Sequence, residues 1–217
     1  MPGKLEDFVN ISRFKAVLCL DGKLPSKTFF DALKIPIIAA DGATNKLCSI
    51  GITPNFVIGD CDSVNINLLK NVPHLKDEDQ NTSDFQKAMN YMRTNALYPA
   101  IICGVSGGHL DHIINNVGIF MENPGNVFID DDMIGFCLRA DHEFEFPIDT
   151  KLSIFGMPKC AVTSEGLKWE LRNSELSFPG KNSCFNRVIA PKLRFEIQSG
   201  SALLVVYRKQ VKDAGIF

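Results

Sequence analysis

The chain has 217 residues, of which 45% are hydrophobic and 22% are charged, and its formal net charge is −2. These values are typical of a globular protein with room for one large domain or two small ones. Neither half carries the basic excess of a nucleic-acid-binding surface. No apolar run approaches the roughly 20 residues that a membrane-spanning helix needs.

The cysteines and residues 1–13 indicate in which cellular compartment the protein is expected. Seven cysteines are scattered without a Cys-x-x-Cys pair, and most lie in apolar runs, as Cys19 does. This distribution is typical of reduced thiols and not of disulfide bonds or zinc ligands. Residues 1–13 mix charges of both signs and lack the apolar stretch of a secretory signal. We therefore expect a soluble, cytoplasmic protein.

The first half alternates short apolar runs with helical patterns. The expected strands cover residues 16–20, 36–40, 56–58 and 100–103. The expected helices cover residues 27–34, 43–50, 66–70, 82–95 and 109–122. This alternation predicts a parallel sheet with crossover helices, a Rossmann-like α/β domain.

Two helices have the clearest patterns. The helix over residues 82–95 has a capping box at Ser83 and Gln86. Its apolar stripe consists of Phe85, Ala88, Met89 and Met92. The expected buried face of the helix over residues 109–122 consists of Leu110, Ile113, Ile114, Val117 and Phe120 or Met121.

The pattern changes after a helix-breaking segment at residues 123–126. Beyond it the chain shows short strand-like runs at residues 127–129, 134–138, 152–155, 167–171, 193–197 and 202–207. Glycine, proline and asparagine separate these runs, which predicts an all-β half. We expect an α/β domain over residues 1–125 and a β-sandwich over residues 126–217.

Asp60 and Asp62 follow a buried strand and Gly59. In an extended segment, residues two apart point to the same side. Their carboxylates are therefore expected to converge where functional groups collect in an open α/β sheet. Two carboxylates held together are unfavourable unless a cation lies between them. The stretch favours a Mg²⁺ site, and an acidic turn without a metal is the alternative.

Other polar residues also lie where strands are expected to end. Asp41 follows the second strand, the polar stretch 79–84 precedes one long helix, and residues 107–112 open the other. In a doubly wound sheet such positions converge on one crevice. So many carboxylates indicate a divalent cation with a phosphate-bearing ligand. For Asp84 alone, complementing the helix dipole is the alternative.

The glycine loop at residues 104–108 has two interpretations. It can bring backbone N–H groups close to an anion at the start of the following helix, or it can be an ordinary turn. It is neither a Walker A loop nor a G-x-G-x-x-G fingerprint. On that helix Asp111 and Asn115 share a face, whereas His112 points elsewhere and is more often a structural donor in such a position.

In the second half, Trp169 offers a flat ring that could stack on a heteroaromatic ligand, and Ser183 lies in a polar loop that could donate hydrogen bonds. A core or surface-strand aromatic is the alternative for Trp169.

These motifs together resemble the thiamin pyrophosphokinase family. The resemblance rests on four ordered blocks and a later Gly166-Leu167-Lys168-Trp169 segment; the blocks are Asp41-Gly42-Ala43-Thr44-Asn45, residues 54–63, residues 79–84, and Gly107-Gly108-His109-Leu110-Asp111-His112 with Asn115 or Asn116. It implies an α/β nucleotide-binding domain followed by a β-sandwich, and a homodimer with active sites between subunits. It also implies that ATP donates a pyrophosphoryl unit to thiamin and releases AMP, with Mg²⁺ as cofactor.

The resemblance implies roles for individual residues. Asp41, Asp60, Asp62 and Asp84 would be catalytic and would hold Mg²⁺. The expected ATP-binding residues are Gly42, Asn45, Asp79, Gln80, Ser83, Gly107, Gly108, His109, Asp111 and His112. The expected thiamin-binding residues are Asn115, Trp169 and Ser183.

The chain departs from the family pattern in several places. His109 stands where the family usually has arginine, and the late Ser-Asn pair has Ser183-Cys184 as its nearest match. Two alternative functions are also consistent with these residues. One is a different metal-dependent nucleotide transferase or hydrolase, and the other is a non-catalytic module that binds thiamin or a nucleotide.

Overall fold

The computed structural model describes residues 5–130 and 132–208. The chain forms two compact units. Of the described residues, 12–130 form what we call the α/β unit, and 5–11 with 132–208 form the β unit. The domain boundary at residue 125 that we expect from the sequence stays a prediction; strand β6, just beyond it, belongs to the α/β unit.

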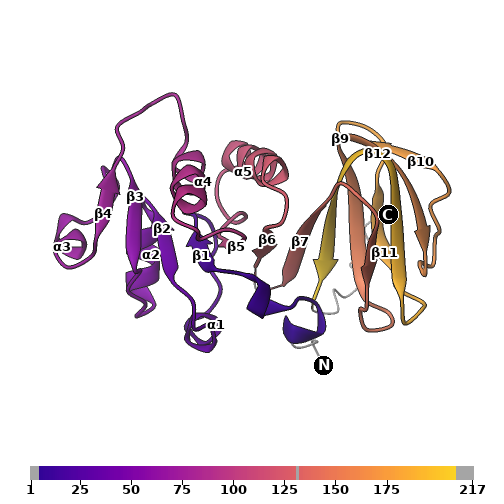
Figure 1. Cartoon of the computed structure of the whole chain (residues 1–217), viewed down its shortest axis with the longest axis horizontal. Coiled ribbons are helices and arrows are strands. Elements are labelled where there is room, and N and C mark those ends of the chain that lie inside the picture. Colours follow the sequence, from indigo (N-terminus) through magenta and orange to yellow (C-terminus); the bar gives the residue numbers. More distant parts are fainter. Residues whose placement is uncertain (1–4, 131, 209–217) are drawn as a thin grey trace. The chain divides into compact units, whose positions relative to one another are not determined.

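The α/β unit contains a parallel sheet with the strand order β6-β5-β1-β2-β3-β4 (Figure 1). The strands are β1 Ala16–Cys19, β2 Ile37–Ala40, β3 Phe56–Gly59, β4 His74–Lys76, β5 Ala100–Cys103 and β6 Val127–Ile129. Strands β1, β2 and β5 are buried along their whole length. This explains why each reads as a continuous apolar run without alternation. The exposed edge strand β4 has no such run, and the sequence did not predict it.

Helices connect these strands, and the alternation predicted from the sequence is confirmed. They are α1 Lys27–Ala32, α2 Ala43–Ser49, α3 Ile66–Leu69, α4 Asp84–Thr94 and α5 Leu110–Glu122. Helix α4 packs against β2 and β3 and lies next to α5 (Figure 1). The predicted stripe of α4 is buried, and its capping box is present at Ser83 and Gln86. Among the described residues, no helix is long and apolar enough to cross a membrane.

The predicted buried face of α5 is wrong over the first turns of the helix. Leu110 is 72% exposed and Ile114 is 51% exposed, whereas Phe120 and Met121 are buried as expected. Periodicity identified the apolar side of this helix correctly. The buried residues of the helix are Ile119, Phe120 and Met121, near its C-terminal end, whereas Leu110 and Ile114 in the first turns are exposed.

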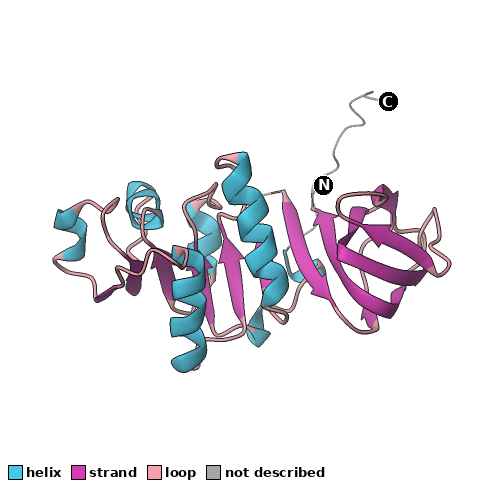
Figure 2. Ribbon diagram, turned by 90° about the horizontal axis from the view of Figure 1, so that it is seen from above, coloured by secondary structure: helices cyan, strands magenta, loops and turns pink. Residues whose placement is uncertain are grey.

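The β unit is antiparallel, with the strand order β10-β9-β12-β7; β11 pairs with β9, and β8 pairs with β12. The strands are β7 Met133–Leu138, β8 His142–Phe144, β9 Lys151–Glu165, β10 Ser174–Ser177, β11 Ser183–Arg187 and β12 Leu193–Tyr207. The two runs predicted at 193–197 and 202–207 are one strand, interrupted by irregular pairing between Ile197 and Ala202. From α5 to residue 208 the described chain contains only strands and loops (Figure 2). The predicted fold class is thus confirmed.

The strand predicted at residues 167–171 is wrong. These residues form a loop that is organised by the Glu170 carboxylate. Its Oε1 accepts hydrogen bonds from the backbone N–H groups of Gly166, at 2.8 Å, and Leu167, at 3.0 Å. Two main-chain donors are thereby committed to a side chain and not to a neighbouring strand.

Candidate active site

A cavity of about 450 Å³ lies in the α/β unit, beside the carboxyl ends of β1, β2 and β3. This is the edge at which open α/β sheets bind their ligands, and the volume suits a small-molecule ligand. We call it the acidic cavity; its charged lining residues are Asp21, Asp41, Asp60, Asp62, Asp84 and Lys87. Five carboxylates face one ammonium group, so the cavity is poorly suited to a phosphate unless a cation is also bound.

Three of the carboxylates converge on one point. Asp41, Asp60 and Asp62 each offer an oxygen that lies within 4.8 Å of the others. The predicted convergence of Asp60 and Asp62 is therefore found, but the expected reason for it is wrong. The strand ends at Gly59, and Cys61 adopts a left-handed conformation with φ of 61°. A tight turn, in which the Asp62 N–H donates to Asp60 Oδ1 at 3.2 Å, brings the two side chains together.

Asp41 is the buried member of this group, with 8% of its surface exposed. Burial raises the pKa of its carboxyl group, and the negative charges of Asp84 and Asp60 add to the rise, while a hydrogen bond from Ser63 opposes it. Its Oδ1 is fully buried and has no hydrogen-bond partner among the described residues. A buried, ionised carboxylate oxygen without a donor is unfavourable, and either a bound cation or protonation of Asp41 would relieve this.

Asp60 and Asp84 differ in their electrostatic surroundings. The N–H of Asp62 holds the pKa of Asp60 below its ordinary value, with a further contribution from Gln80, whose Nε2 lies 3.5 Å from Oδ2. Burial raises the pKa of Asp84, although the ammonium group of Lys87 partly offsets the effect. Of these two, Asp60 therefore stays ionised more readily, and Asp84 binds a proton more readily.

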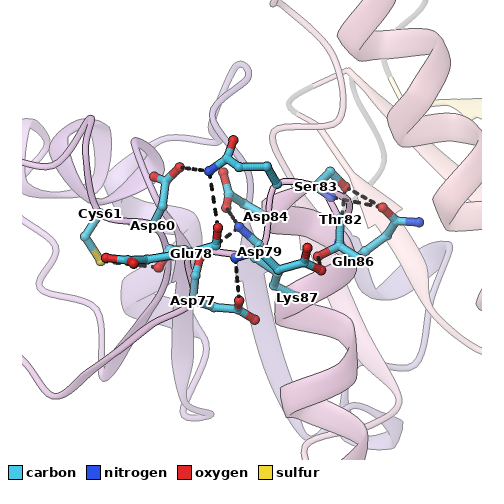
Figure 3. A network of polar contacts seen from close by, with 12 residues as sticks. Asp60, Cys61, Asp77, Glu78, Asp79, Thr82, Ser83, Asp84, Gln86 and Lys87 are labelled. Atoms are coloured by element: carbon cyan, nitrogen blue, oxygen red, sulfur yellow. Dashed lines mark hydrogen bonds and ion pairs between the residues drawn. The ribbon is translucent and has the colours of Figure 1, made fainter.

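The loop before α4 carries residues of the cavity wall (Figure 3). Asp79 organises this loop, because its Oδ1 accepts from the Asn81 N–H at 2.9 Å and its Oδ2 accepts from the Thr82 hydroxyl at 2.9 Å. These bonds lower the pKa of Asp79. The loop presents Gln80 toward Asp60, and it ends at Ser83, the N-cap residue of α4.

The donor set fits a magnesium ion. Mg²⁺ prefers carboxylate oxygens, and here three lie close together with a fourth carboxylate, Asp84, beside them. The Asp41 oxygen that lacks a donor is a position that a cation would satisfy. Asp84 is not one of the three closest carboxylates, but its charge raises the pKa of Asp41.

The structure brings together about half of the residues predicted for the site. The predicted residues that line the acidic cavity are Asp41, Gly42, Asp60, Asp62, Gln80, Ser83, Asp84, His112 and Asn115. On α5, His112 and Asn115 are three residues apart and share the side that lines the cavity, whereas Asp111 does not line it. The sequence predicts that Asp111 and Asn115 share one functional face. In this cavity, His112 accompanies Asn115 instead.

Several other predicted ATP-binding residues lie outside the cavity lining and have structural contacts. Asn45 accepts from the Asn65 N–H at 3.0 Å and donates to the Ser63 carbonyl at 2.7 Å, so it supports the loop after β3. Gly107 lies against Lys23, because an added β-carbon there would lie 2.5 Å from the Lys23 Cβ. Gly108 is open, and His109 is the N-cap residue of α5 without a side-chain capping bond.

The sequence interpretation missed two charged residues of the cavity, Asp21 and Lys87, and gave no role of their own to Ser63 and Thr82, which lie in the predicted blocks. Asp21 could have been found, since it follows β1 as Asp41 follows β2. Lys87 could not, because nothing in the spacing of α4 distinguishes it from an exposed lysine.

In the β unit, Trp169 and Ser183 are linked through Asn186. The Asn186 side chain is buried; its Nδ2 donates to the Trp169 carbonyl at 2.7 Å and to Ser183 Oγ at 3.2 Å. Its Oδ1 accepts from the Trp169 N–H at 3.2 Å. Trp169 itself is 54% exposed, with Lys168 Nζ 4.7 Å from the centre of its ring. The exposed ring contradicts the core alternative for this residue.

Comparison with known families gives two matches in chain order. Residues 32–128 match the family described as "Thiamin pyrophosphokinase, catalytic domain", and residues 141–204 match "Thiamin pyrophosphokinase, vitamin B1 binding domain". The chain belongs to the thiamin pyrophosphokinase family. The predicted resemblance is thereby confirmed, and the two matches together cover about three quarters of this family member.

Relatives of this thiamin pyrophosphokinase family member are distant in sequence. "Thiamine pyrophosphokinase 1" of Arabidopsis thaliana is 28% identical over 67% of the chain and 62% of its own length. "Thiamine pyrophosphokinase 1" of Oryza sativa subsp. japonica is 25% identical over 85% of the chain and 84% of its own length. The chain thus spans about three fifths of the length of the Arabidopsis relative.

The fold also matches solved structures. The crystal structure of yeast thiamin pyrophosphokinase superposes with a TM-score of 0.76 at 18% identity and covers 88% of this chain and 85% of its own. Within this family member, Asp41, Asp60, Asp62 and Asp84 fall in the segment matched to the catalytic domain. Trp169 and Ser183 fall in the segment matched to the vitamin B1 binding domain.

Proposed function

We propose that this chain is a thiamin pyrophosphokinase, which transfers the pyrophosphoryl group of ATP to the hydroxyethyl oxygen of thiamin and releases AMP. The observation that carries the proposal is the acidic cavity, in which Asp41, Asp60 and Asp62 converge around a buried oxygen without a donor. Family membership supports the identity of the two substrates.

The proposed cofactor is Mg²⁺, held by Asp41, Asp60, Asp62 and Asp84. When bound, Mg²⁺ would neutralise charge on the phosphate groups of ATP and on the departing AMP. The chain's own contribution is to hold the carboxylates and both substrates in fixed positions, which supplies much of the rate in phosphoryl transfer. Among the four, Asp84 has a raised pKa and is not fully buried, so it is better suited than Asp60 to accept the hydroxyl proton of thiamin.

The proposed nucleotide contacts divide into two groups. Gly42, Gln80, Ser83 and His112 line the acidic cavity and can reach a ligand there. The other predicted ATP-binding residues, which lie outside its lining, remain proposals from the family resemblance: Asn45, Asp79, Gly107, Gly108, His109 and Asp111.

The proposed thiamin contacts are Asn115, Trp169 and Ser183. The exposed, flat ring of Trp169 suits stacking against a heteroaromatic ring. Asn186 supports this arrangement, because its side chain donates hydrogen bonds to both the Trp169 carbonyl and the Ser183 hydroxyl.

We propose that the protein is a cytoplasmic homodimer with active sites at the subunit interface. The exposed Leu110 and Ile114 support an interface on α5, the helix that also supplies His112 and Asn115 to the cavity. A double substitution of Leu110 and Ile114 by serine should convert a dimer to a monomer in light scattering after size exclusion. A native protein that is monomeric at micromolar concentration would contradict the proposed dimer.

The deciding experiment is a product assay with the full chain, ATP, Mg²⁺ and thiamin, followed by chromatography of the nucleotides. We expect equal amounts of AMP and thiamin diphosphate, and loss of both when the metal is chelated. Formation of ADP or free phosphate would indicate a different metal-dependent transferase or hydrolase. Thermal stabilisation by thiamin without turnover would indicate a binding module.

A further inference from the structure

Lys87 is a charged residue on the buried face of α4. It is only 6% exposed, and it lies among the apolar residues that pack this helix against the sheet. An ammonium group at such a position is unfavourable unless hydrogen bonds and an opposite charge replace water. The contacts of the Lys87 ammonium group therefore indicate its role.

One of the two partners of Lys87, Asp84, lines the acidic cavity, and the other, Asp77, lies at the start of the loop that carries Gln80 (Figure 3). Its Nζ donates to the Asp77 carbonyl oxygen at 2.9 Å and forms an ion pair with Asp84 Oδ1 at 3.4 Å. Asp77 immediately follows β4, and Asp84 is the first residue of α4. One ammonium group thus joins both ends of the loop that carries Gln80.

Hydrogen bonds also link the loop at residues 77–83 to the segment that carries Asp60. The Asp77 N–H donates to the Gly59 carbonyl at 2.8 Å, so the residue before Asp60 is tied to the same loop. From the middle of the loop, Gln80 Nε2 reaches Asp60 Oδ2 at 3.5 Å. Lys87 is consequently placed to fix Asp84 and, through the loop, Asp60.

As a bare charge, Lys87 would oppose a metal ion in the cavity. It brings a positive charge next to carboxylates that are suited to a cation, and like charges repel more strongly where water is excluded. A charge that only repelled the ligand would weaken binding. Its burial and its two contacts are instead consistent with a role in geometry.

We propose that Lys87 is a positioning residue of the carboxylate site, which holds Asp84 and the loop at residues 77–83 in the arrangement that binds a divalent cation. The inference rests on the proposed function in one respect, namely that the carboxylates bind a metal. Groups that hydrogen-bond a metal ligand typically change metal affinity by roughly 10- to 100-fold when they are removed.

The test measures the binding of Mn²⁺ to the full chain without ATP or thiamin. Electron paramagnetic resonance reports the concentration of free Mn²⁺ in the titration. We expect Lys87→Met to weaken Mn²⁺ binding by roughly tenfold or more, although it removes a positive charge. The matched control is Lys76→Met, because Lys76 is exposed and pairs with Glu78 of the same loop without touching Asp84. This control should bind Mn²⁺ as the native chain does.

A double-substitution cycle tests whether Lys87 acts through Asp84. In an Asp84→Ala background, Lys87→Met should weaken Mn²⁺ binding less than it does in the native chain, because Lys87 then keeps only its contact with the Asp77 carbonyl. A full effect in that background would contradict the proposed route. Lys87→Gln, which keeps a donor but shortens the side chain, should weaken binding in the same direction, and it decides the question if Lys87→Met does not fold by circular dichroism.

The remaining outcomes separate this inference from the proposed function. Unchanged or tighter Mn²⁺ binding in a folded Lys87→Met protein would overturn the positioning role, even if the native chain makes AMP and thiamin diphosphate. Failure of the native chain to bind Mn²⁺ at millimolar concentration would overturn both the metal site and the role of Lys87.

Discussion

The main chain of Gly59 lies directly against the side chain of Asp41. A β-carbon added at Gly59 would lie 2.9 Å from the Asp41 Cβ and 3.2 Å from an oxygen of Asp84. Gly59 also has a φ of 151°, a region that residues with a side chain rarely adopt. Only glycine therefore lets the end of β3 approach β2 and α4 closely enough for the carboxylates to meet.

Substitution of Gly59 by alanine should disturb both the fold and the site. We expect a loss of roughly 1–3 kcal/mol in the free energy of unfolding, from backbone strain and steric overlap, measured by urea denaturation without metal. The control is Gly118→Ala in α5, where an added β-carbon meets no atom within 4 Å. This exposed helical position should gain up to about 1 kcal/mol. Equal stability of the Gly59→Ala and native proteins would contradict the steric argument.

Asp60 should be required for turnover but not for folding. Asp60→Asn keeps the shape of the side chain and removes its charge, so we expect kcat to fall by roughly 10²-fold or more. Because Asp60 is only partly buried, the melting temperature without metal should shift by about 2 °C or less. Asp31→Asn, on α1 and paired with Lys27, should retain activity. Near-native turnover of Asp60→Asn would contradict the assignment of the site.

Asp41 should make the metal-free protein less stable as the pH rises. Its pKa in the folded chain is raised above the ordinary aspartate value of about 3.9, so folding disfavours the charged form. The stability associated with a neutral Asp41 is fully present below that ordinary value and is lost as the pH rises through the raised pKa. In chelator, Asp41→Asn should therefore melt above the native protein at pH 7, and the difference should shrink toward zero below pH 4.

Magnesium should reverse this order. The native protein should gain stability from Mg²⁺ at pH 7, because the ion binds only the folded chain, whereas Asp41→Asn should gain much less. The measurement is melting temperature against pH, with chelator and with Mg²⁺, for both proteins. A difference between them that does not change with pH would show that the burial of the Asp41 charge is not its cause.

Local patterns predicted the elements well where the information lies in neighbouring residues. The capping box at Ser83 and the stripe of α4 are both found, because they depend on spacing within one helix. Strand ends also placed Asp41, Asp60 and Asp62 together, since the edge of a parallel sheet gathers such residues.

Features that depend on distant contacts were not predictable in this way. The burial of Lys87 depends on how the loop at residues 77–83 folds over α4, which the spacing of the helix does not encode. Residues 167–171 have a strand-like composition, but the side chains of Glu170, Asn186 and Ser164 accept hydrogen bonds from the N–H groups of Leu167, Trp169 and Leu171. On α5, periodicity identified an apolar side, but it could not predict that Leu110 on this side is exposed.

Trp169 should contribute to the binding of thiamin and not to the chemical step. Its ring is exposed while its main chain is held by Asn186, so it can offer a fixed flat surface at little further loss of conformational entropy. Since aromatic contacts of this kind contribute about 0.5–1.5 kcal/mol, Trp169→Ala should raise the KM for thiamin by roughly three- to tenfold at unchanged kcat. Trp169→Phe should recover most of the loss, and Phe178→Ala, which removes another exposed ring of the β unit, should leave the KM as it is. A fall in kcat with an unchanged KM for thiamin would contradict stacking and would place Trp169 in the reaction itself.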